Sequence, residues 1–148
     1  MVRGDTPRLI DIDAQLPSLV DYLQRYPGLA AAFLYGSYGT PNQTPRSDVD
    51  LALLFEPGPE IKLADQLRLE ADIAGILRED DVNVLVLNQA PVPLRFAVLA
   101  QNRPLLIRHP EAVADFHELV LNIYGDLILD LEQFDRDTLA RLEESHDA

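Results

Sequence analysis

The sequence predicts a single α/β domain, and three observations support this fold class. Four short apolar runs alternate along the chain with segments of helical spacing. Each run is apolar with little interruption, which is typical of strands that are buried on both faces of a sheet. The 148 residues suit one domain, and no Gly/Ser-rich linker divides them. We therefore expect one domain over residues 1–148, with a core at about 14–110 and a C-terminal helical segment at about 110–142.

The four apolar runs are expected to form strands because they are short and apolar, and the third is also β-branched. Pro27-Gly28 precedes the first run, and Pro57-Gly58-Pro59 follows the second. The runs occupy residues 29–35, 50–55, 82–87 and 103–108. The phase of the pattern leaves the order of the strands in the sheet open.

Helices are expected where apolar residues recur at spacings of three and four. These segments are residues 13–26, 60–78 and 94–100, and the chain from 110 onward. One side of the first helix carries Leu16, Leu19, Val20 and Leu23. The buried side of the second is expected to consist of Leu63, Leu67, Ala74 and Leu77.

Composition narrows the class of function. The chain has 25 acidic and 12 basic residues, a formal charge of −13. Such a surface repels phosphate backbones, so we expect no direct binding of nucleic acid. It suits a basic protein partner or a site that concentrates cations, although a surface selected for solubility explains the charge equally well. The absence of cysteine excludes disulfides and thiolate sites. No apolar run approaches the ~20 residues of a membrane span, and we expect a cytoplasmic protein.

The first expected strand runs directly into Gly36-Ser37, which can form a phosphate-binding turn. Glycine lets the backbone turn sharply and lets a phosphate approach without meeting a Cβ. If Ser37 opens a helical turn, its amide and those of its neighbours point at an anion, and its hydroxyl adds a donor. The polar segment that begins at Gly36 contains Gly36, Gly39, Pro41 and Pro45, so it can hold no more than about one helical turn. We expect Gly36 and Ser37 to bind the phosphates of a nucleotide.

Ten residues separate Ser37 from Asp48-Val49-Asp50, which lie at the start of the second expected strand. Side chains two apart on a strand leave on the same side, ~6.6 Å apart at their Cα atoms, so both carboxylates face one cleft. Carboxylates at that separation can share Mg²⁺ ions spaced ~3.5–4 Å, and Mg²⁺ in proteins usually takes one or two carboxylates plus substrate phosphates. We expect Asp48 and Asp50 to be both catalytic and metal-binding, with ATP as substrate. The alternative is a glycine turn followed by surface acids.

These motifs carry a resemblance to a known family. The run from Leu34-Tyr35-Gly36-Ser37 to Ser47-Asp48-Val49-Asp50-Leu51 resembles the Gly-Ser-x10-Asp-x-Asp signature of the polymerase-β-like nucleotidyltransferase superfamily. Chain size, element order and the stretch Val82-Asn83-Val84-Leu85-Val86-Leu87-Asn88-Gln89-Ala90-Pro91 resemble its minimal nucleotidyltransferase (MNT) branch. The resemblance covers about residues 14–110 and, more loosely, the final helix. It implies the polymerase-β-like nucleotidyltransferase fold, a short central mixed sheet flanked by helices.

MNT proteins of this kind are commonly antitoxins paired with HEPN-domain ribonucleases. The resemblance therefore implies a protein adenylyltransferase that uses ATP and Mg²⁺ to transfer AMP to a tyrosine of a HEPN toxin, which silences the toxin. Two rival functions stay open. One is a catalytically weakened antitoxin that blocks its toxin by contact alone. The other is a transferase for a small hydroxylated molecule such as an aminoglycoside, which usually needs a further substrate domain.

The chain departs from the family pattern at one position. Complete members carry a third acid on the strand that corresponds to residues 82–87, where this chain has Asn83. Asparagine is a poorer metal ligand than a carboxylate and cannot act as a general base for the attacking hydroxyl. Asp81 lies two residues earlier and can replace the missing acid if the strand begins that soon, whereas a solvated turn at Glu79-Asp80-Asp81 is the simpler interpretation.

Four arginines are candidate ligands of the nucleotide or of a partner. Arg46 adjoins the two aspartates, where it can contact a triphosphate or merely offset the acids. The other three follow the third strand and form either a basic pocket or a scatter of solvated side chains: Arg95, Arg103 and Arg108.

The final helix has more apolar surface than one contact requires. A near-heptad seam runs along Val113, Phe116, Val120, Ile123, Leu127, Leu131, Phe134 and Thr138. Further apolar residues widen it: Leu119, Leu121, Tyr124, Ile128 and Leu129. The excess suggests a contact with a partner or a second copy, and the alternative is a helix packed only on its own core.

Overall fold

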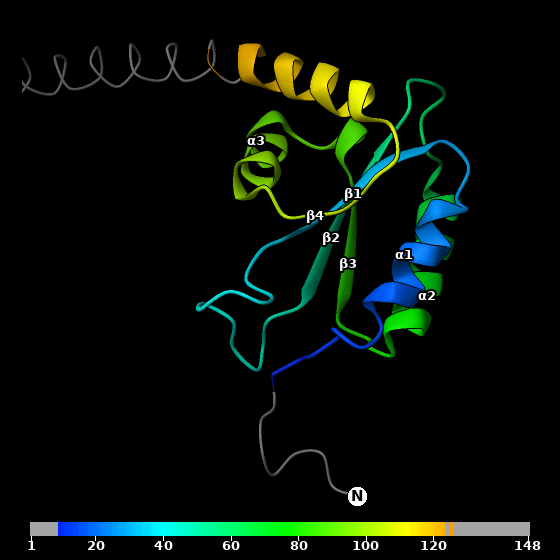
Figure 1. The fold of residues 1–148 in the computed structure, drawn as a ribbon, viewed down its shortest axis with the longest axis vertical. Coiled ribbons are helices and arrows are strands. Elements are labelled where there is room, and N and C mark those ends of the chain that lie inside the picture. The colour runs from blue at the N-terminus through cyan, green and yellow to red at the C-terminus, as the bar shows by residue number, and fades with distance from the viewer. Residues whose placement is uncertain (1–8, 124, 126–148) are drawn as a thin grey trace, which may run out of the picture.

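The computed structural model describes residues 9–123 and residue 125. The chain forms, in order, α1 (Leu16–Gln24), β1 (Leu29–Tyr35), β2 (Val49–Phe55), α2 (Leu63–Leu77), β3 (Val82–Val86), the 3₁₀ turn η1 (Leu87–Gln89), α3 (Val92–Gln101) and β4 (Pro104–Ile107) (Figure 1). A further helix begins at residue 110 and is helical through residue 123. The four expected strands and the first three expected helices thus form, with their ends shifted by a few residues, and the expected C-terminal helix forms over the part that the structure describes.

The four strands form one mixed sheet in the order β3-β2-β1-β4. β1 pairs antiparallel with both β2 and β4, whereas β2 and β3 are parallel. Parallel neighbours need a crossover connection, which α2 provides between β2 and β3. The predicted α/β fold, with a short mixed sheet between helices, is confirmed.

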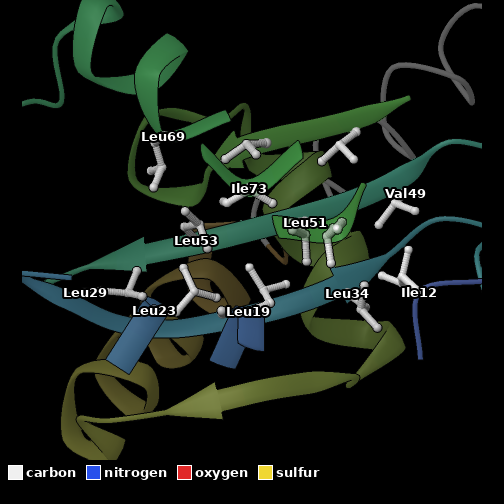
Figure 2. Packing of buried hydrophobic residues seen from close by; sticks show 14 of the residues in the cluster. Ile12, Leu19, Leu23, Leu29, Leu34, Val49, Leu51, Leu53, Leu69 and Ile73 are labelled. Carbon is white, nitrogen blue, oxygen red and sulfur yellow. The ribbon is translucent and has the colours of Figure 1, made fainter. Parts of the chain in front are cut away.

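Both faces of the sheet are covered. α1 and α2 lie on one face, and α3 and the helix from residue 110 lie on the other (Figure 1). The larger apolar cluster joins α1 and α2 to the sheet through residues such as Leu19, Leu51 and Ile73 (Figure 2). The smaller cluster includes Phe33, Leu54 and Val98. Burial on both sides explains why the strands read as nearly continuous apolar runs.

The buried side of α2 differs from the predicted one. Leu63 and Leu67 are 70% and 57% exposed, whereas Leu69, Ile73 and Leu77 are buried. The helix carries two apolar stripes, each with a four-residue period. Leu63 and Leu67 belong to the first stripe, and only the second, which consists of Leu69, Ile73 and Leu77, faces the sheet and α1. The prediction joined residues of both stripes because helical spacing alone does not show which stripe the sheet covers.

Among the described residues, no helix has both the length and the apolar composition that a membrane crossing requires.

Candidate active site

The two aspartates lie where β2 begins to pair with both of its neighbours. Asp50 pairs with Tyr35 of β1 on one side and with Asn83 of β3 on the other. Paired residues on adjacent strands point to the same face, so these three side chains lie in one row across the sheet. Asp48 precedes β2 by one residue and lies on the same side as Asp50. The row faces the side of the sheet that α3 covers, where Tyr35 is half-buried.

The carboxylates of Asp48 and Asp50 converge on one point. The side-chain amide of Asn83 donates hydrogen bonds from Nδ2 to Oδ2 of Asp48 and to Oδ1 of Asp50, both at 3.0 Å. One donor therefore lies between two anionic oxygens, where a small cation would also be attracted. Asp81 is exposed, one residue before β3, and its backbone oxygen accepts from the Val49 N–H at 2.9 Å.

Gly36 brings the first turn against this acidic pair. Its φ of +76° lies in the left-handed region, which favours glycine. A Cβ at this position would also collide with Oδ2 of Asp50. Two independent constraints therefore require glycine here, and the backbone of the turn lies directly beside the carboxylate.

The turn after Gly36 is not helical. The Thr40 N–H and hydroxyl both bond to the Ser37 carbonyl, at 3.0 and 2.7 Å, and residues 36–48 form successive turns. Gly39, at φ +72°, and the prolines at positions 41 and 45 are incompatible with a continued helix. The helical turn considered for Ser37 is therefore replaced by a hydrogen-bonded tight turn.

Ser37 is connected to the acidic pair through Ser47. The Ser37 hydroxyl donates to Oγ of Ser47 at 2.7 Å, and Oγ of Ser47 also accepts from the Thr44 N–H at 2.9 Å. Because Ser47 adjoins Asp48, this bond ties the two ends of the polar segment together. The sequence does not predict this contact of Ser47, because a serine in a polar loop carries no distinctive signal.

The three later arginines form neither a basic pocket nor a group of free solvated side chains. Each guanidinium donates hydrogen bonds to backbone carbonyls close to it. Arg95 bonds to Asn88 and Ala90, and its guanidinium also lies 5.6 Å from the ring centroid of Phe116. Arg108 bonds to Tyr26. Arg103 alone reaches the candidate site, through the carbonyls of residues 36 and 38. Arg46 is exposed.

Burial and charge make Asp50 an unfavourable place for an uncompensated negative charge. Burial raises the pKa of its carboxyl above the ordinary 3.8, the hydrogen bond from Asn83 lowers it, and the charge of Asp48 raises it again. Burial, with the charge of Asp50 adding to it, also raises the pKa of Tyr35 to about 12, so Tyr35 stays neutral. The described residues contain no cluster of three or more acidic or histidine side chains that fits a metal ion. Two convergent carboxylates form the cation-attracting feature of this site.

Comparison with known families assigns the class of protein. Residues 18–111 match the family described as Polymerase beta, Nucleotidyltransferase. The matched region contains β1 to β4, the glycine turn and both aspartates. The chain therefore belongs to the polymerase beta nucleotidyltransferase family, as its Gly-Ser and Asp-x-Asp motifs imply. No curated protein matches the chain significantly.

Solved toxin–antitoxin complexes contain chains of the same fold. A chain in the structure of tri-AMPylated Shewanella oneidensis HEPN toxin in complex with MNT antitoxin is 21% identical, with a TM-score of 0.67 over 87% of this chain and 99% of that one. A chain in a toxin–antitoxin structure with AMP-PNP is 22% identical, with a TM-score of 0.67 over 85% and 97%. A chain of the MntA–HepT toxin–antitoxin is 20% identical, with a TM-score of 0.64 over 85% and 97%. The chain thus has the fold found in MNT structures.

The raised pKa of Asp50 leads to a prediction about stability. The native state binds a proton at Asp50 more tightly than the unfolded chain does, so the contribution of this group is full below the unfolded pKa and is lost as pH rises through the folded pKa. Asp50→Asn removes the charge and keeps an acceptor for Asn83. We expect it to raise the free energy of unfolding at pH 7, measured by urea denaturation in EDTA, with the difference disappearing below pH 3.8.

Asp80→Asn, at an exposed position, serves as the control and should not reproduce this pH dependence. An Asp50→Asn protein that is no more stable than the wild type at pH 7 would contradict the electrostatic description of the site.

Proposed function

We propose that the chain is an MNT-type antitoxin that binds ATP with Mg²⁺ and transfers AMP to a tyrosine of a HEPN ribonuclease. The observation that carries the proposal is the convergence of Asp48 and Asp50 on one point beside the Gly36 backbone. Chains of the same fold occur in a complex of tri-AMPylated HEPN toxin with MNT antitoxin and in a toxin–antitoxin structure with AMP-PNP. AMPylation and AMP-PNP belong to those structures, and for this chain the support is the geometry of its own aspartates and glycine turn.

The donor set fits Mg²⁺, which prefers oxygen ligands and is often held by one or two carboxylates together with substrate phosphates. Asp48 and Asp50 would hold it, and when bound it would neutralise charge on the phosphates. The turn at Gly36 and Ser37 would receive the phosphate groups, since its backbone approaches the acids without an intervening side chain. Positioning and charge neutralisation are the chief requirements of nucleotidyl transfer, so this small set of residues suffices in principle.

Asn83 supports a second candidate function. It stands in register with Asp50 and presents an amide donor to both acids, where a complete member of the family is expected to have a third carboxylate. An amide cannot remove the proton from a tyrosine hydroxyl. An antitoxin that binds nucleotide but neutralises its toxin by contact alone is therefore the alternative.

A partner surface is supported by the helix that begins at residue 110. Val120 is buried and Phe116 is partly buried against the sheet, whereas Leu119, Leu121 and Ile123 are 50%, 46% and 41% exposed. The apolar excess expected from the sequence thus exists in the described turns of this helix. Its expected continuation from residue 126 lies outside the described residues. Leu119 and Ile123 are four residues apart and share one face of this helix, whereas Leu121 lies on another side. We propose that the face with Leu119 and Ile123, within a chain of charge −13, contacts a basic toxin.

The first prediction from this proposal concerns the acidic pair. Asp48→Asn and Asp50→Asn should each lower AMP transfer by at least roughly 10²-fold, because each removes one charge from a site that must neutralise phosphate. The measurement is the intact mass of the neighbouring gene's product, tested as the HEPN toxin, after incubation with this chain, ATP and Mg²⁺. The wild type should add one or more AMP units. Transfer at the wild-type rate by both variants, with Asp80→Asn as the matched exposed control, would refute the site assignment.

The second prediction concerns Asn83. Asn83→Asp should raise the rate of transfer, by up to roughly 10²–10⁴-fold if proton removal from the acceptor limits the reaction. Without Mg²⁺ the same variant should have a lower Tm, because a third negative charge replaces the amide that bridges Asp48 and Asp50. If Asn83→Asp brings no gain and Asp81→Asn is silent, then transfer does not depend on a third acid in this strand.

The third prediction concerns association with the toxin. If the negative charge of this chain speeds its association with a basic toxin, the association rate should fall as salt rises from ~0.05 to ~0.5 M. The dissociation rate should change little. Leu119→Asp should accelerate dissociation, because it places a charge in the proposed apolar contact. Leu63→Asp, at a 70% exposed leucine of α2, is the matched control and should bind normally. A salt-independent association rate, together with wild-type dissociation of the Leu119 variant, is the result that excludes this interface.

A further inference from the structure

The backbone of Gly36 is held by two side chains far away in the sequence. Gln101, the last residue of α3, accepts from the Gly36 N–H through Oε1 at 2.9 Å and donates from Nε2 to the Gly36 carbonyl at 3.1 Å. Arg103 donates from Nη1 to the same carbonyl at 3.4 Å and from Nη2 to the Tyr38 carbonyl at 2.5 Å. Both backbone groups of this glycine are therefore satisfied by side chains rather than by the sheet.

The link between α3 and β4 is shaped to make these contacts. Asn102 has a φ of +50°, in the left-handed region, and reverses the chain between Gln101 and Arg103. The Arg103 carbonyl accepts from the Leu34 N–H at 2.9 Å, which fixes this link against the end of β1. Residues 101 and 103 thereby reach the same turn from one short segment.

The contacts determine which way the turn presents its amides. In a trans peptide unit the carbonyl and the following N–H point in opposite directions. Because the Gly36 carbonyl points to Gln101 and Arg103, the Ser37 N–H points to the other side of the turn. Within the described part of the chain, that N–H has no hydrogen-bond partner. The turn thus has an anchored carbonyl side and a free N–H at Ser37, the polarity that an anion requires.

The conformation and small size of Gly39 fit the contact between Arg103 and the turn. Its φ is +72°, and a Cβ there would lie 3.0 Å from Nη2 of Arg103. The Gly39 N–H is taken up by Oε1 of Gln43 at 2.8 Å, in agreement with the Tyr38 carbonyl pointing to Arg103. The second glycine therefore allows the guanidinium to lie close behind the turn.

We propose that Gln101 and Arg103 are positioning residues that set the Gly36–Ser37 turn for a nucleotide phosphate. They act through the backbone and do not touch the substrate. This inference depends on the nucleotide-binding part of the proposed function and is independent of AMP transfer and of the toxin. It also gives α3 a role beyond packing, since the end of this helix supplies the first of the two contacts.

Gln101→Met is the main test, because it keeps the length of the side chain and removes both hydrogen bonds. We expect the Gly36 amide to exchange its hydrogen at least about tenfold faster, and the dissociation constant of AMP-PNP with Mg²⁺ to rise about 5- to 50-fold. In transfer assays KM should rise while kcat changes less than about threefold, since the acidic pair is unaltered. Arg103→Met should act in the same direction. Arg103→Lys should be intermediate, because a single ammonium does not reproduce the two-point contact.

Matched controls come from the opposite end of the sheet. Gln89→Met removes a 3.3 Å bond to the Ile61 carbonyl, and Arg108→Met removes a 2.7 Å bond to the Tyr26 carbonyl. Both should leave nucleotide affinity and Gly36 exchange unchanged. If Gln101→Met lowers the Tm but binds AMP-PNP as the wild type does, the role is structural only and the inference is wrong. A wild type that binds no nucleotide would overturn the proposed function and this inference together, whereas a wild type that binds without transferring AMP would overturn only the transfer.

Discussion

The candidate site depends on the register in which β2 pairs with β1 and β3. This register places Asp50 between Tyr35 and Asn83 in one row, at the end of the sheet where β1 turns away at Gly36. A slip of one residue would move the aspartates to the opposite face, which α1 and α2 cover. The buried residues of β2 on both faces therefore fix the chemistry as well as the fold. Leu51 and Leu53 belong to one cluster, and Ala52 and Leu54 to the other.

The same register creates an electrostatic cost that the rest of the fold must offset. It brings the two carboxylates close together and partly buries one of them, which raises the pKa of Asp50. The Asn83 amide offsets part of this cost by donating to both carboxylates, and the exclusion of a Cβ at Gly36 keeps the turn close to them. Sites that bind charged ligands commonly reduce stability in this way. The apolar clusters on both faces of the sheet provide the compensating stability.

The sequence predicted the strands, most of the helices and the acidic pair, because these depend on local patterns. Continuous apolar runs identify strands buried on both faces, and a Gly-Ser turn before Asp-x-Asp has a defined spacing. The sequence did not show that α2 buries Leu69 and Ile73 rather than Leu63 and Leu67, since the choice depends on which stripe meets the sheet. It also did not reveal the contacts of Gln101 or Arg103 with the turn, which join residues 65 to 67 positions apart. Asn83 was recognised as a missing acid, but its role as a donor to both aspartates follows only from the β2–β3 pairing.

We propose that Asp48, Asp50 and the Gly36 turn form one cation-dependent nucleotide site. Isothermal titration calorimetry of the isolated chain with AMP-PNP tests it most directly, performed once with Mg²⁺ and once with EDTA. We expect saturable binding with Mg²⁺ at about one nucleotide per chain, and binding at least about tenfold weaker in EDTA. Equal affinity under both conditions, or no binding with Mg²⁺, would contradict it.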